Sequence, residues 1–126
     1  MHPKQLEAVF ALESKKRYEY LIKKVADAEE VYVILDQEEC YVTCGSEKEV
    51  IIPVWPEREF AEELIQREWK DCKAHPLHLD DFADLLDELT EENYLVAGFP
   101  NRELNASVVS PEDMIAHLHE ELKKYR

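Results

Sequence analysis

The sequence predicts an α+β domain in which about five helices pack on a mostly antiparallel sheet. Several segments space their apolar residues at i, i+3, i+4 and i+7, which is typical of amphipathic helices. Three short β-branched runs follow one another between residues 31 and 54, with short polar turns between them, and this predicts a three-strand antiparallel meander. A chain of 126 residues with 45% hydrophobic residues supports one core, so we expect a single domain over residues 1–126.

Two helices are expected before the first strand. A short helix over residues 3–12 would bury one side, formed by Leu6, Val9 and Phe10. Ser14 is expected to cap a second helix over residues 15–26, because serine side chains accept hydrogen bonds from the first helical turn. The apolar stripe of this helix consists of Tyr18, Leu21, Ile22 and Val25. Tyr20 lies off the stripe among lysines, so it is either an exposed contact point or covered by a neighbouring helix.

The three strands of the meander come next. Residues 31–35 are β-branched and aromatic, which predicts a strand buried on both faces. Residues 40–44 would form a second strand, in which Cys40, Val42 and Cys44 share one face. Residues 50–54 would form the third strand, after a turn over residues 45–48 in which Gly45 is free to take a positive φ.

The second half of the chain is richer in helix. Pro56 is expected at the first position of a helix that continues to Trp69, with an apolar face of Phe60, Ala61, Leu64 and Ile65. Residues 73–79 are expected to be extended, and Pro76 would confine them to the edge of a sheet. Asp80 would cap a fourth helix that ends at Asn93 and buries Phe82, Leu85, Leu86 and Leu89.

Two short strands and a last helix complete the predicted fold. Residues 94–97 and 106–109 have strand character. The clearest helix start of the chain is Ser110 followed by Pro111, because a serine cap and a proline at the first helical position occur together. The last helix would bury Met114, Ile115, Leu118 and Leu122.

The charge of the chain is strongly negative and unevenly distributed. The net charge is −14. Residues 1–24 hold six Lys/Arg and three Glu, a net of +3, whereas the other 102 residues hold nine Lys/Arg and 26 Asp/Glu, a net of −17. Such a surface repels phosphates, so we expect no nucleic-acid partner. A basic protein partner is compatible with this charge, although solubility alone is the simpler explanation.

The sequence favours a cytoplasmic protein without a membrane segment. No apolar run approaches the roughly 20 residues that a membrane helix needs. The N-terminal residues lack the apolar core of a signal peptide. An odd number of cysteines (Cys40, Cys44 and Cys72) in such a chain indicates free thiols in a reducing compartment.

Neither metal binding nor catalysis is favoured by the motifs. In a strand, Cys40 and Cys44 would lie about 13 Å apart, too far to share one zinc ion. The pairs His75/His78 and His117/His119 each point in divergent directions. We therefore expect no metal, no cofactor and no enzyme activity. The alternative is a small-molecule binder or enzyme whose pocket would be lined by Trp55, Trp69, Cys72 and His75.

Acidic residues are the strongest candidates for a binding surface. Residues 74–101 contain no Lys or Arg, and the helix over residues 80–92 carries seven carboxylates. Together with the helix over residues 57–63, it would build an acidic face whose expected binding residues are Glu59, Glu63, Asp80, Asp81, Asp84, Asp87 and Glu88. Trp55 is added as a further candidate that would be either a packed plug or a pocket wall. The competing interpretation of the carboxylates is the solvated side of an amphipathic helix.

Four segments resemble a known family: residues 17–27 (RYEYLIKKVAD), residues 53–56 (PVWP) with Ala61 and Trp69 after them, residues 79–82 (LDDF) and residues 96–100 (VAGFP). They occur in the same order in a family of small bacterial proteins known as domain of unknown function 2750. The resemblance covers roughly residues 14–122. It implies a compact α+β domain in the bacterial cytoplasm and supplies neither an activity nor catalytic residues.

Three functional hypotheses follow. The leading one is a non-enzymatic interaction module that binds a basic protein through the acidic face, for example as an immunity-type inhibitor. The second is the small-molecule binder or enzyme described above. The third is a structural homo-oligomer formed by pairing of an exposed strand edge.

Overall fold

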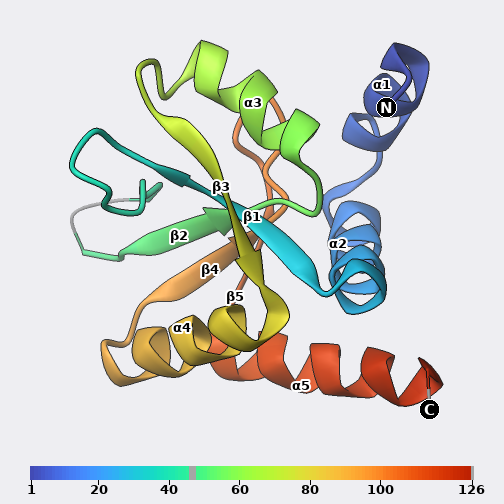
Figure 1. Cartoon of the computed structure of the whole chain (residues 1–126), viewed down its shortest axis with the longest axis vertical. Coiled ribbons are helices and arrows are strands. Elements are labelled where there is room, and N and C mark those ends of the chain that lie inside the picture. Colours follow the sequence, from blue (N-terminus) through green and yellow to red (C-terminus); the bar gives the residue numbers. More distant parts are fainter. Residues whose placement is uncertain (46–47, 126) are drawn as a thin grey trace.

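The computed structural model describes residues 1–45 and 48–125 and shows an α+β fold (Figure 1). Its helices are α1 (Pro3–Phe10), α2 (Ser14–Ala28), α3 (Arg58–Arg67), α4 (Leu79–Glu91) and α5 (Pro111–Leu122), and a 3-10 turn η1 (Lys123–Tyr125) follows α5. Its strands are β1 (Glu30–Leu35), β2 (Ile51–Val54), β3 (Lys73–His78), β4 (Leu95–Gly98) and β5 (Ser107–Val109). Within the described residues, no helix is long and apolar enough to cross a membrane.

The strands form two small sheets. β1 pairs with β3 in antiparallel orientation, with Tyr32 opposite Pro76. The second sheet has the order β2-β4-β5, in which β2 and β4 are parallel while β4 and β5 are antiparallel. A bridge between Tyr32 and Trp55 connects the two sheets through backbone hydrogen bonds of 2.8 and 2.9 Å. The expected position of Pro76 at a sheet edge is confirmed, because among the described strands β3 pairs only with β1.

The predicted meander is formed only in part: residues 40–44 make antiparallel bridges to β1 and β2 but are not a regular strand. Residues 40–44 form only isolated bridges, between Tyr41 and Leu35 and between Cys44 and Ile51. The Asp36 carboxylate accepts the backbone N–H groups of Glu38 and Cys40, so the chain after β1 curls locally instead of extending. The predicted turn over residues 45–48 includes residues 46 and 47, which lie outside the described residues. Gly45 has the expected positive φ, 119°.

The second sheet is mixed, because β2 and β4 are parallel, whereas the other two strand pairs are antiparallel as expected. The connection from β2 to β4 contains α3, β3 and α4, and a connection of this length is what parallel pairing requires. Strand periodicity reports which face is buried but not which strand is the neighbour, so the sequence pattern did not distinguish the two arrangements.

The predicted apolar stripes form the core. The apolar positions of α2 and α4 are buried, apart from the half-buried Tyr18. Aromatic rings from three segments pack together in the core. The ring centroid of Phe60 lies 5.0 Å from that of Phe10 and 4.7 Å from that of Phe99. In Figure 1, α4 and α5 lie side by side below the sheets, α2 runs beside them, and α3 lies at the opposite end of the molecule.

One of the predicted helix starts is confirmed in detail and three are displaced. The Ser110 hydroxyl accepts the N–H of Asp113, and Pro111 is the first residue of α5. Ser14 does not cap α2, because it is itself the first helical residue. Pro56 precedes the first residue of α3 by two positions. α4 is capped not by Asp80 but by His78, whose Nδ1 accepts the N–H of Asp80 at 3.2 Å.

Candidate functional site

Trp55 lies entirely inside the core. It has no exposed surface, and its Nε1–H donates to the carbonyl of Pro100 at 3.1 Å. The centroid of its ring lies 6.0 Å from that of Trp69, and the two rings are edge to face. Of the two expected roles, the geometry is that of a packed plug. Trp55 is therefore not available at the surface for binding.

Of the four residues expected to line a pocket (Trp55, Trp69, Cys72 and His75), Cys72 lines a small hollow together with Asp36, Gln37, Glu38, Lys70 and Asp71. Burial, and then the negative charges of Asp36 and Asp71, raise the pKa of the Cys72 thiol. This direction is the opposite of what an activated nucleophile requires. Among the described residues, no three His, Cys, Asp or Glu side chains lie together as metal ligands would.

The outer side of α4 is a dense acidic surface. Its exposed carboxylates are Asp80, Asp81, Asp84, Asp87, Glu88 and Glu91. Within the described chain, none of these groups has an ion pair with a lysine or arginine, and the Asp80 carboxylate lies 3.8 Å from Nδ1 of His78. The negative charge of this helix also acts on Tyr41. Burial raises the pKa of the Tyr41 phenol, and the charges of Glu88 and Asp81 raise it further.

The two predicted acidic residues of α3 are not part of this surface. Glu59 lies 3.2 Å from the N-terminal amine of Met1. Glu63 lies 2.7 Å from the guanidinium of Arg102, which also donates to Glu7 at 2.9 Å. These contacts hold α1 and the loop after β4 against α3. Because α3 and α4 lie at opposite ends of the molecule (Figure 1), their carboxylates do not form one continuous face.

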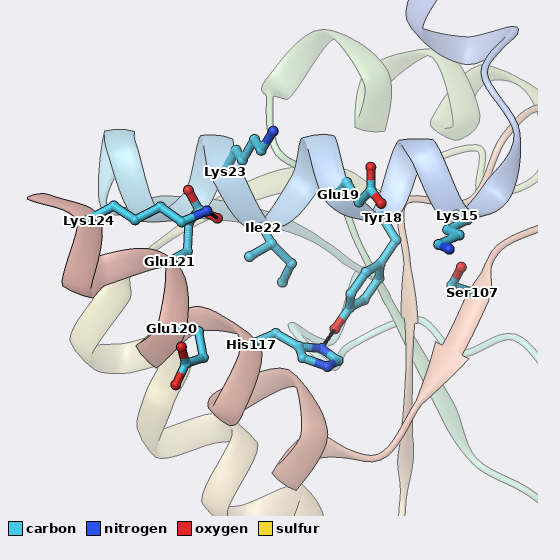
Figure 2. Close-up of a pocket in the computed structure, with 10 residues that line it drawn as sticks. All are labelled: Lys15, Tyr18, Glu19, Ile22, Lys23, Ser107, His117, Glu120, Glu121 and Lys124. Carbon is cyan, nitrogen blue, oxygen red and sulfur yellow. Dashed lines mark hydrogen bonds and ion pairs between the residues drawn. The ribbon is translucent and has the colours of Figure 1, made fainter.

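A groove between α2 and α5 has a volume of about 570 Å³. Figure 2 shows that Tyr18 of α2 and His117 of α5 point toward each other across its floor, and Ile22 projects into it. The hydroxyl of Tyr18 lies 2.6 Å from Nδ1 of His117. The sequence pattern placed Tyr18 in the core and gave His117 no role, because nothing local indicates that these two residues, 99 positions apart, meet.

The protonation of Tyr18 follows from its surroundings. Burial, and then the negative charge of Asp113, raise the pKa of the Tyr18 phenol. The phenol therefore stays protonated at neutral pH, and the tautomer of the His117 ring sets which of the two groups donates in their hydrogen bond. The Tyr18 ring rests on Gly98, where an added Cβ would lie only 2.5 Å from a ring carbon.

The chain matches one family, described as "Protein of unknown function (DUF2750)", over residues 18–118. This range includes all of α4 and both residues of the Tyr18–His117 pair, whereas Lys15 at the end of the groove lies before it. A search of the curated proteins gives no match.

Proposed function

The chain belongs to the DUF2750 family, whose description names no activity, and on this premise we propose that it is a non-enzymatic module that binds a basic protein through α4. The binding surface consists of the exposed carboxylates of Asp80, Asp81, Asp84, Asp87 and Glu88. The expected contributions of Glu59 and Glu63 are left out, because both groups have intramolecular partners.

One observation supports this proposal above all. The six exposed carboxylates of α4 lie in a region of the sequence, residues 74–101, that contains no Lys or Arg. Carboxylates brought close without cations repel one another, and a partner that supplies lysine or arginine side chains relieves this repulsion. Such a surface also accelerates association with a positively charged partner by electrostatic steering. An immunity-type inhibitor of a basic toxin is one concrete form of this function.

The proposal is tested by quantitative capture of proteins from cells of the native host at low and high salt. We expect basic proteins to be retained at low salt and released at high salt, because salt screens exposed charges. A triple variant of α4 should lose this retention: Asp84→Asn, Asp87→Asn and Glu88→Gln.

A control with the same change in net charge uses exposed carboxylates elsewhere in the chain: Glu38→Gln, Glu49→Gln and Glu68→Gln. It should retain the partner, because the α4 surface is intact. Recovery of no basic protein at low salt would count against the proposal, and so would equal losses in the two triple variants, since these would reflect net charge alone.

A further inference from the structure

A small hollow between α4 and α5 is lined mainly by aliphatic side chains. It has a volume of about 140 Å³, and Asp80 and His119 complete its lining. Two of the aliphatic residues are buried and four are half-buried or exposed: Leu86 and Leu118, and then Leu79, Ala83, Ile115 and Leu122. The hollow is therefore open to water, and an apolar side chain that filled it would be stabilised by burial.

The α4–α5 hollow lies beside the acidic surface of α4. Asp80 lines the hollow itself, and Ala83 in its wall is the direct neighbour of Asp84. The exposed residues Asp80, Asp84 and Asp87 are spaced i, i+4 and i+7, so they form one stripe along the helix. Within the described chain, none of the three carboxylates has a lysine or arginine partner. An apolar hollow thus lies next to three negative charges that no cation of the chain neutralises.

The spacing of this stripe favours a helix as the occupant. Asp80 and Asp87 lie about 10 Å apart along the axis of α4. A helix that runs along α4 with cations at i, i+4 and i+7 repeats this spacing turn for turn. In an extended segment, side chains on one face recur every 6.6 Å or so, which places the third cation roughly 3 Å out of step. A helix seated on two others also projects its side chains into the groove between them.

We propose that the α4–α5 hollow receives one aliphatic side chain of a basic amphipathic helix in the partner protein. Lysines or arginines beside this anchor contact Asp80, Asp84 and Asp87. The volume of about 140 Å³ suits one side chain, since an engineered apolar cavity of about 150 Å³ holds one benzene molecule. The inference rests on the function proposed above and adds to it the secondary structure of the partner and an apolar anchor.

The test uses four alanine-based peptides of 18 residues, a length at which such peptides form helix. The first peptide carries lysines at i, i+4 and i+7 and a leucine next to the middle lysine. In the second peptide, serine replaces the leucine, and in the third, glutamine replaces the three lysines. The fourth has the composition of the first in an order that spreads the lysines around the helix. NMR titration of the protein at low salt gives both the affinity and the amides that each peptide contacts.

We expect the first peptide to shift the amides of α4 and α5 around the hollow. The serine peptide should bind at least about tenfold more weakly, because it loses the burial of an aliphatic side chain. The glutamine peptide should bind about tenfold more weakly, because it loses three exposed ion pairs. The reordered peptide should also bind about tenfold more weakly, because its cations do not follow the stripe.

Variants of the protein locate the apolar contact. Ala83→Gln should weaken binding of the first peptide about tenfold, because a longer side chain occupies the hollow. The control Ala8→Gln makes the same change at an exposed position of α1, at the other end of the molecule from α4 (Figure 1), and should leave binding unchanged.

A second pair of variants locates the charged contact. Asp84→Asn combined with Asp87→Asn should weaken binding more than Asp81→Asn combined with Glu88→Gln. Both pairs remove two charges from α4, but Asp81 and Glu88 act on Tyr41 and lie outside the stripe.

The outcomes separate this inference from the function on which it rests. Equal binding of the leucine and serine peptides, of the first and reordered peptides, or of the variants within either pair would overturn the helix and its anchor. If the lysine peptides still bind α4 in that case, the basic-partner function stands on charge alone. If no lysine peptide binds α4, the inference is also overturned, and the capture experiment above decides the proposed function independently.

Discussion

At the scale of single residues, the buried polar side chains hold the structure together through their hydrogen bonds. Arg17 is 2% exposed and donates to the carbonyls of Leu12, Phe99 and Asn105 and to the hydroxyl of Ser14. The loop it holds contains two non-glycine residues with positive φ, Phe99 at 63° and Leu104 at 64°. Because such backbone conformations cost free energy, the hydrogen bonds of the guanidinium help to hold this strained segment against α2.

We predict that Arg17→Lys lowers the free energy of unfolding by about 2–4 kcal/mol. Lysine retains the charge, but its compact ammonium group cannot reach the carbonyls of Leu12, Phe99 and Asn105 together. Urea denaturation measures the effect, with Lys16→Arg, an exposed neighbour, as the control that should change little. An equal stability of Arg17→Lys and the unmodified protein would show that the spread of the guanidinium contacts is unimportant.

Tyr20 is covered rather than exposed, which decides between its two expected roles. Its hydroxyl donates to Glu57 at 2.6 Å, and its ring lies 5.9 Å from that of Phe99. Burial, and then the hydrogen bond and charge of Glu57, raise the pKa of the Tyr20 phenol. The folded state therefore holds this proton more tightly than the unfolded state does.

A pH dependence follows from this pKa shift. The stabilisation by the Tyr20 phenol is fully present below its ordinary pKa, about 10, and is lost as the pH rises through the higher pKa of the folded state. We expect the free energy of unfolding to fall as the pH rises above about 10, and to fall less steeply in Tyr20→Phe. Tyr125→Phe, at an exposed position near the C-terminus, is the control and should keep the original slope. Identical slopes for all three proteins would contradict the prediction.

At the scale of secondary structure elements, the helix starts show how local signals succeed and fail. Ser110 and Asp80 are both good capping residues by type. Ser110 has extended backbone and caps α5, whereas Asp80 lies inside the first turn of α4 and His78 takes the capping position. The residue type alone does not indicate where the backbone becomes helical.

This difference can be measured. Ser110→Ala should lower the free energy of unfolding by about 1 kcal/mol, because the N–H of Asp113 loses its acceptor. Asp80→Asn should change stability by less than about 0.5 kcal/mol, because the exposed Asp80 carboxylate is not a cap. The two urea denaturation midpoints provide the comparison. A larger loss in Asp80→Asn than in Ser110→Ala would mean that the capping assignment is incorrect.

At the scale of the whole molecule, the two outer strands are poorly suited to pairing with another copy. β3 contains Pro76, which lacks an N–H donor, and β5 is only three residues long. The net charge of −14 adds repulsion between copies. The exposed Val108 of β5 is the one large apolar side chain of the described strands that is open to solvent.

We therefore expect light scattering to give the monomer mass, 14.8 kDa, at high protein concentration and moderate salt. A dimer would contradict this expectation and favour the structural homo-oligomer hypothesis instead. In that case Val108→Lys, which places a charge on the β5 edge, would show whether β5 forms the interface.

Local chemistry by itself determined much of this protein. The spacing of apolar residues predicted the buried stripes of α2 and α4. The alternation of helical spacing with β-branched runs predicted an α+β fold, and the ordered short segments indicated the family. These features could be predicted because helical periodicity and burial depend on residues within a few positions of one another.

Only the tertiary structure decided what lies next to what. In the tertiary structure, β1 pairs with β3 and β2 pairs with β4. Glu63 forms an ion pair with Arg102, and Tyr18 forms a hydrogen bond with His117. Each of these contacts joins residues that are distant in the sequence, and the pattern around either partner is the same whether or not the other is near. The acidic surface of α4 could thus be predicted from the sequence, whereas the separation of α3 from it and the groove beside α2 could not.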